Sequence, residues 1–176
     1  MTQQAERRRP RTRDPEYRVL RRLARATAKG VPERPVAALE QVADLARELT
    51  HARYAALIVT GAADYVEGFV VSGLTKEEER KLKAPPQGHG PLGAMRQDGL
   101  AVRLDDLGQH AQSFGFPPQH PEMKTLLGVP IWVRGEVRGA LYVTDRDGGK
   151  AFRDGDQVSL EVLARHAGGV IADRWY

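Results

Sequence analysis

One histidine in a proline-rich stretch is the residue of this sequence whose setting best suits chemistry. His120 follows Pro117 and Pro118 closely and stands directly before Pro121. Proline fixes its own φ and biases the preceding residue toward an extended backbone, so these prolines restrict the movement of the imidazole. A rigidly held neutral imidazole can bind a metal ion or haem iron. The alternative is that the prolines only shape a surface loop and that His120 faces water.

The absence of cysteine narrows the remaining chemistry. The 176 residues include no cysteine, so a thiol nucleophile, a thiolate-held zinc or iron–sulfur cluster and a thioether-linked cofactor are excluded. Asp105 and Asp106 are typical of a turn, and no nucleophile stands beside a base. We therefore expect no enzymatic activity. Any cofactor must be held by histidine, carboxylate, hydroxyl or packing.

The positive charge of the chain is concentrated at its start. Residues 1–30 hold ten Arg or Lys and three Asp or Glu, whereas the remainder holds seventeen basic and twenty acidic residues. We expect a disordered basic arm over 1–14 and an amphipathic basic helix over 15–30, with nucleic acid or an anionic membrane surface as weaker alternatives. The residues expected on the apolar face of this helix are Tyr17, Leu20, Leu23 and Ala24.

From residue 31 to residue 176 the hydrophobic pattern predicts one domain of mixed helices and strands. Thr75 and Glu78 have the spacing of a capping box, which begins a short helix. In chain order we expect a helix over 36–49, strands over 54–60 and 66–72, a short helix over 76–82, a glycine-rich turn and short helix near 88–95, a small strand over 100–104, a hairpin of strands 127–134 and 136–145 around Gly135, and a terminal helix over 154–171. The stretch 105–125 has no regular period, and loops of that length are usually functional.

This order of elements predicts an α+β fold. A central antiparallel sheet would carry the terminal helices on one face, and the irregular middle segment would enclose a ligand pocket on the other. Alternation sorts the side chains of the hairpin, because neighbouring residues of a strand point to opposite faces. Leu127, Val129 and Leu141 fall on one face of the sheet. Ala140 and Tyr142 fall on the opposite face, so Tyr142 is predicted to point into the pocket.

The second half of the sequence resembles a known family. The runs that carry the resemblance are Arg103-Leu104-Asp105-Asp106, Gly115-Phe116-Pro117-Pro118, His120-Pro121-Glu122-Met123, Leu127-Gly128-Val129-Pro130 and Gly139-Ala140-Leu141-Tyr142-Val143-Thr144-Asp145. Over about residues 36–174 the chain resembles GAF domains. Within that family it is most similar to the haem-binding first GAF domain of the actinobacterial dormancy-survival sensor histidine kinases, which sense oxygen, nitric oxide and carbon monoxide.

This resemblance implies a haem b site. His120 matches the proximal ligand of the iron, Tyr142 the distal tyrosine and His110 a further pocket histidine, while Glu67 corresponds loosely to an acidic residue at the haem edge. Phe116, Met123 and Leu126 would supply apolar walls. The function implied is a gas or redox sensor in a two-component system. The alternative is a non-haem GAF module that binds another small metabolite or serves as a dimerisation platform.

The expected setting is the cytoplasm. The sequence contains neither eighteen consecutive apolar residues nor an apolar stretch after the basic start. As a sensor, the chain would form a homodimer through its terminal helices or signal to a histidine kinase or regulator. If the chain is complete, it is a free-standing sensory module. If it is a fragment, its output domain has been removed.

Overall fold

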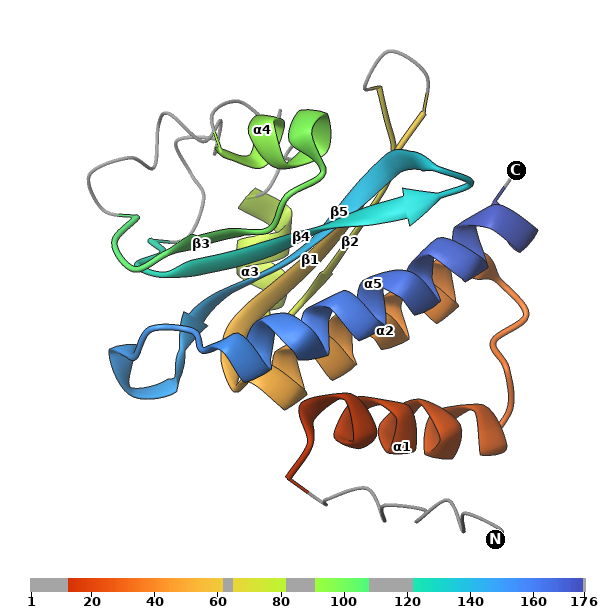
Figure 1. The fold of residues 1–176 in the computed structure, drawn as a ribbon, viewed down its shortest axis with the longest axis horizontal. Helices are drawn as coiled ribbons and strands as arrows, with labels where there is room; N and C mark the ends of the chain where they lie inside the picture. Colours follow the sequence, from red (N-terminus) through yellow and green to blue (C-terminus); the bar gives the residue numbers. More distant parts are fainter. Residues whose placement is uncertain (1–12, 62–64, 82–90, 108–121, 176) are drawn as a thin grey trace, which may run out of the picture.

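The computed structural model describes residues 13–61, 65–81, 91–107 and 122–175 (Figure 1). It has the predicted α+β architecture with one antiparallel sheet. The helices are α1 (Pro15–Ala28), α2 (Pro35–Thr50), α3 (Lys76–Lys81), α4 (Pro91–Asp98) and α5 (Asp154–Arg174), with a short 3-10 turn, η3 (Asp147–Gly149). The strands are β1 (Ala52–Thr60), β2 (Val66–Ser72), β3 (Val102–Leu104), β4 (Leu126–Val133) and β5 (Glu136–Arg146). The helices and strands expected from the sequence are thus present, with ends shifted by a few residues, whereas most of the expected arm over 1–14 and the glycine-rich turn at 88–90 lie outside the described residues.

The sheet places β1 and β5 next to each other near its centre. Its strand order is β2-β1-β5-β4-β3, and all the pairs are antiparallel. The turn between β4 and β5 consists of Arg134 (φ 50°) and Gly135 (φ 86°). Two successive residues with positive φ form the tight turn that matches the twist of a hairpin, and Gly135 adopts this conformation without strain. The predicted hairpin is therefore confirmed.

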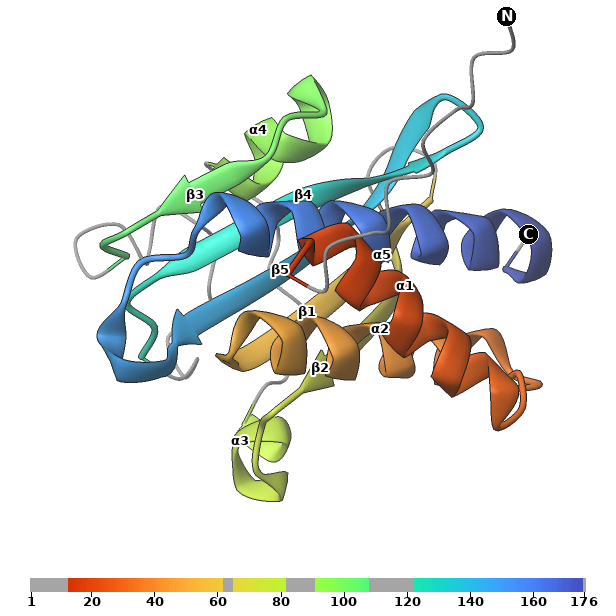
Figure 2. The ribbon, with the colours of Figure 1, turned by 60° about the horizontal axis from the view of Figure 1, so that its bottom comes forward.

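Helices α1, α2 and α5 lie on one face of the sheet and α4 lies on the other (Figures 1 and 2). On the helix side, the side chains of Leu127, Val129, Leu141 and Val143 form a core with α2 and α5. Ala140 and Tyr142 belong to a second buried cluster on the face that carries α4. The predicted alternation is therefore confirmed. No helix within the described ranges combines the length and the apolar character needed to span a membrane.

Helix α1 packs through a face that only partly matches the predicted one, which included Leu23 but not Val19. Val19 and Leu23 are buried, whereas Leu20 is 51% exposed and Ala24 is exposed. Residues four apart share a helix face, and α1 uses this narrow stripe because its packing partner is α5, not the sheet. Val19 and Leu23 also join the core between the sheet and the helices, so α1 is part of the same body as the rest of the domain.

Two adjacent glycines of α5 have different surroundings. A Cβ at Gly168 would lie 2.4 Å from the carbonyl oxygen of Trp132 on β4, so the absence of a side chain lets the helix approach the sheet. A Cβ at Gly169 would have no atom within 4 Å. Close packing of the helix on the sheet therefore depends on Gly168 and not on Gly169.

We expect opposite effects when alanine replaces each glycine. Gly168→Ala should lower the free energy of unfolding by about 1–3 kcal/mol, because the new methyl group meets backbone that cannot move alone. Gly169→Ala is the matched control and should raise it by about 0.5–1 kcal/mol, because alanine loses less conformational entropy in a helix. Urea unfolding of the two variants measures this difference. Equal effects would contradict the close approach.

Candidate functional site

Two hydroxyl groups on β5 face a small cavity on the α4 face of the sheet, here called the inner cavity. Tyr142 is 2% exposed and Thr144 is 1% exposed. The inner cavity has a volume of about 20 Å³. The other residues that line it come from β1, from β2, and from the segments after β2 and before β4, and they are Tyr54, Ala55, Ala56, Phe69, Val71, Leu74 and Met123. Because residues 142 and 144 alternate with Leu141 and Val143, both hydroxyls point to the same side.

Neither hydroxyl finds a hydrogen-bond partner among the residues that the structure describes. A buried polar atom left unpaired costs about 1–3 kcal/mol, and most such atoms in folded proteins have a partner. Burial also raises the pKa of Tyr142 far above its usual range, so its hydroxyl stays protonated and can donate. Thr144 can donate or accept. Each hydroxyl is therefore available to a polar atom of a ligand or water.

Tyr54 connects the inner cavity to α3. Its hydroxyl donates to Glu78 Oε1 at 3.0 Å. Glu78 also accepts from the backbone N–H of Thr75, whose own hydroxyl accepts from the N–H of Glu78, so the predicted capping box is confirmed. Burial and this bond to Glu78 raise the pKa of Tyr54. The capping residue of α3 thus also fixes a wall of the cavity.

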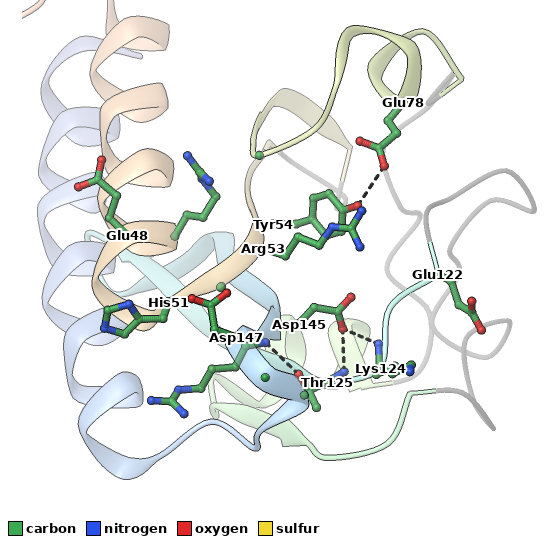
Figure 3. A pocket seen from close by; sticks show the side chains of 16 residues that line it. Glu48, His51, Arg53, Tyr54, Glu78, Glu122, Lys124, Thr125, Asp145 and Asp147 are labelled. Atoms are coloured by element: carbon green, nitrogen blue, oxygen red, sulfur yellow. Dashed lines mark hydrogen bonds between the residues drawn. The ribbon is translucent and has the colours of Figure 1, made fainter.

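Asp145 holds the end of β5 to the segment before β4. Its Oδ1 accepts from the backbone N–H groups of Lys124 at 2.6 Å and Thr125 at 3.2 Å, and its own N–H donates to the carbonyl of Thr125 at 3.1 Å (Figure 3). Asp145 has φ 55°, a left-handed conformation that aspartate tolerates better than most residues. These bonds position Met123, which lines the inner cavity.

A larger open cleft of about 970 Å³ lies at the end of the sheet next to the inner cavity, and we call it the outer cleft (Figure 3). Tyr54 lines both hollows, so its side chain forms part of the wall between them. The guanidinium of Arg53 lies over the Tyr54 ring, 4.9 Å from its centroid. Charges of both signs line the outer cleft: Arg47, Arg53, Lys124 and Arg146 with Glu48, Glu78, Glu122, Asp145 and Asp147.

The structure brings together some of the residues predicted for the site. Tyr142, Met123 and Leu126 are members of the same buried cluster. Glu67 is not among them, because it lies on the edge strand and accepts from the indole Nε1 of Trp175 at 3.3 Å, beside a hollow on the helix side. The predictions for His110, Phe116 and His120 lie outside the described residues. Within those residues no three His, Asp or Glu side chains gather as metal ligands.

Three residues of the site were not identified from the sequence. Tyr54 belongs to an almost continuous apolar run, which conceals the face to which each side chain points. Thr144 has the same parity as Tyr142 on β5, so alternation could have found it. The backbone contacts of Asp145 depend on the pairing of its strand end with a segment twenty residues earlier, and that contact has no signal in the local sequence.

Comparison with known proteins identifies the family to which the sequence is matched. The GAF domain family matches residues 34–172. The GAF domain of a phosphoenolpyruvate-protein phosphotransferase from Coxiella burnetii superposes with a TM-score of 0.70 at 21% identity, over 90% of this chain and 93% of that one. The corresponding Acinetobacter domain gives 0.69 at 19% identity, over 89% and 92%. A GAF domain/HD domain protein from Geobacter sulfurreducens gives 0.67 at 20% identity, over 80% and 94%. At these identities the superpositions show a shared fold.

Removing the unpaired hydroxyl should stabilise the protein in the absence of ligand. We expect Tyr142→Phe to raise the free energy of unfolding by about 1 kcal/mol, because the phenyl ring keeps the packing without a buried donor. Tyr54→Phe is the matched control and should lower it by about 1 kcal/mol, because that hydroxyl bonds to Glu78. Chemical denaturation distinguishes the two. A loss of stability in Tyr142→Phe would mean that the hydroxyl has a partner.

Alkaline pH should destabilise the wild-type protein through the same side chain. Burial raises the pKa of Tyr142 in the folded state, whereas an unfolded tyrosine loses its proton near pH 10. Ionisation of Tyr142 therefore leaves the free energy of unfolding unchanged below about pH 10. Above that pH the unfolded chain loses the proton first, so the free energy of unfolding falls as the pH rises toward the folded-state pKa. We expect the free energy of unfolding to fall more steeply above pH 10 in wild type than in Tyr142→Phe. Equal slopes would indicate a solvated hydroxyl.

Proposed function

Since this chain belongs to the GAF domain family, we propose that it is a sensory domain whose small ligand binds on the α4 face of the sheet. The observation that carries this proposal is the pair of buried hydroxyls, Tyr142 and Thr144, that face a cavity without a partner among the described residues. A ligand with polar atoms would supply the partners that these groups lack. The surrounding side chains are mostly apolar, as in ordinary small-molecule sites.

Haem b is the specific ligand of this proposal, with His120 as the proximal ligand and Tyr142 on the distal side. When bound, haem supplies an iron that can take up oxygen, nitric oxide or carbon monoxide. Of the described residues, Tyr142 would donate to the bound gas, while Met123 and Leu126 would keep water away. The chemistry of this wall suits a haem pocket, because its donor is protonated and otherwise unused.

The space between the described side chains is much smaller than a porphyrin. About 20 Å³ is enough for one water molecule, whereas ligand pockets usually measure about 300–1,000 Å³. Haem uptake therefore requires side chains such as Phe69, Leu74 and Met123 to move away from Tyr142. The small volume favours the alternative proposal, a compact non-haem metabolite with a polar group that fits between the two hydroxyls.

Signal output is proposed to occur through the helices on the opposite face. Tyr142 and Thr144 contact the ligand site, while their strand neighbours Leu141 and Val143 pack in the core with α2 and α5. A ligand that displaces β5 would thus change the packing of these helices directly. The terminal helices could pass this change to a second copy of the chain or to a histidine kinase or regulator.

Absorbance spectroscopy tests the haem proposal. Protein produced with a haem precursor should show a Soret band, and His120→Ala should lose it. Tyr142→Phe should retain the band but release oxygen about fivefold faster, the equivalent of a hydrogen bond worth about 1 kcal/mol. His51→Asn, at an exposed position whose left-handed backbone asparagine tolerates, is the control and should behave as wild type.

A colourless protein that takes up no added haemin would reject haem and leave the broader proposal standing. In that case thermal-shift measurements with a panel of compact polar metabolites identify the ligand. Thr144→Val keeps the shape of the side chain but removes its hydroxyl, so it should reduce the shift caused by a true ligand. An unchanged shift in both Thr144→Val and Tyr142→Phe would place the ligand elsewhere.

A further inference from the structure

A second hollow lies on the helix side of the sheet, separate from the inner cavity, and we call it the helix-side cavity. Its volume is about 150 Å³. The cavity is partly open to solvent, since Val36 at its rim is 39% exposed. Its lining comes from the start of α2, from β1 and β2, and from the residue after α5: Val36, Leu39, Leu57, Val59, Glu67, Gly68, Phe69, Val70 and Trp175.

Trp175 forms the outer wall of this cavity. Its ring packs against Gly68, where a Cβ would lie 2.5 Å from the indole, so the ring fits only because residue 68 has no side chain. Its Nε1 donates to Glu67 Oε2 at 3.3 Å. The neighbouring Arg174 donates to the carbonyls of Pro32 and Glu33, which precede α2. The end of α5 is therefore fastened to both sides of the cavity.

The lining defines the class of ligand. Apart from Glu67, the described residues around the cavity are apolar or glycine, and one oxygen of the Glu67 carboxylate accepts from Trp175. Among the described residues Glu67 is the only charged side chain at the cavity, so a charged or strongly polar ligand would lose its hydration without a matching set of partners. An enclosed apolar cavity of this size in another protein binds benzene or xenon, so the volume here suits a ligand of that size. The indole ring adds an aromatic surface for stacking.

We propose that the helix-side cavity is a binding site for a small uncharged apolar molecule, of the size of a single aromatic ring or a short alkyl chain. This site is distinct from the one proposed for sensing, because β2 separates the two. Phe69 and Val71 pack with the cluster on the α4 face, whereas Val70 belongs to the core on the helix side. A molecule in the helix-side cavity would contact Trp175 and so act on the end of α5.

Methyl NMR of the full chain, titrated with benzene as the probe, tests this site. We expect saturable shifts in the methyl resonances of Leu39, Val59 and Val70, together with a shift of the indole N–H of Trp175. The variant Trp132→Phe identifies that indole signal, since the chain has only two tryptophans. Val36→Phe should weaken benzene binding by at least about tenfold, because the ring fills the cavity from its rim.

A matched control separates filling of the cavity from a general effect of added bulk. Val158→Phe introduces the same ring on α5 at a residue that is 37% exposed, against 39% for Val36, and that does not line the cavity. It should bind benzene as wild type does. Equal binding in Val36→Phe and Val158→Phe would overturn the proposal. Shifts confined to Ala56 and Met123 would also overturn it, since they would place benzene in the inner cavity and leave the proposed sensing site intact.

Discussion

The antiparallel pairing of β1 with β5 is the constraint on which the rest of the structure depends. Both strands lie inside the sheet and are covered on both faces, so each consecutive residue must suit one environment or the other. Leu141 and Val143 complete the core under the helices, while Tyr142 and Thr144 stand on the side of the inner cavity. A shift of one residue in the register would exchange these sets and bury two hydroxyls under the helices. The strand register that places Leu141 and Val143 in the core therefore also places Tyr142 and Thr144 at the inner cavity.

The site itself opposes the stability of the fold. Tyr142 and Thr144 are buried without a described partner, although a phenylalanine and a valine would fill the same space. In contrast, three nearby polar side chains are hydrogen-bonded: Tyr54 binds Glu78, Glu78 caps α3, and Asp145 holds the segment before β4. These three side chains support the walls and have partners, whereas the two hydroxyls of the inner cavity have none among the described residues. This division is expected where a pocket is kept ready for a ligand, because its rigid frame reduces the ordering required on binding.

The sequence predicted the elements, the antiparallel sheet, its two layers and the direction of Tyr142, because these depend on local periodicity and turn chemistry. Gly135 marked the hairpin, and Thr75 with Glu78 marked α3. The predicted face of α1 was right for Leu23 and wrong for Leu20, since Val19 and Leu20 are adjacent apolar residues and only the position of α5 decides which is buried. The contact of Glu67 with Trp175 joins residues far apart in the chain, and no local pattern indicates it. Roles that depend on pairs of distant residues thus required the structure.

The unpaired hydroxyls of the inner cavity have a consequence for the life of the protein in a cell. A molecule that binds only the folded state lowers the fraction of unfolded chains. The fraction falls further as the ratio of ligand concentration to dissociation constant rises. Proteases remove unfolded chains continuously, so a small gain in stability can change abundance several-fold. A domain that gives up stability to keep two donors free would accumulate when its ligand is plentiful and be degraded when it is scarce. The amount of the protein in the cell would then report the ligand concentration, as its conformation does.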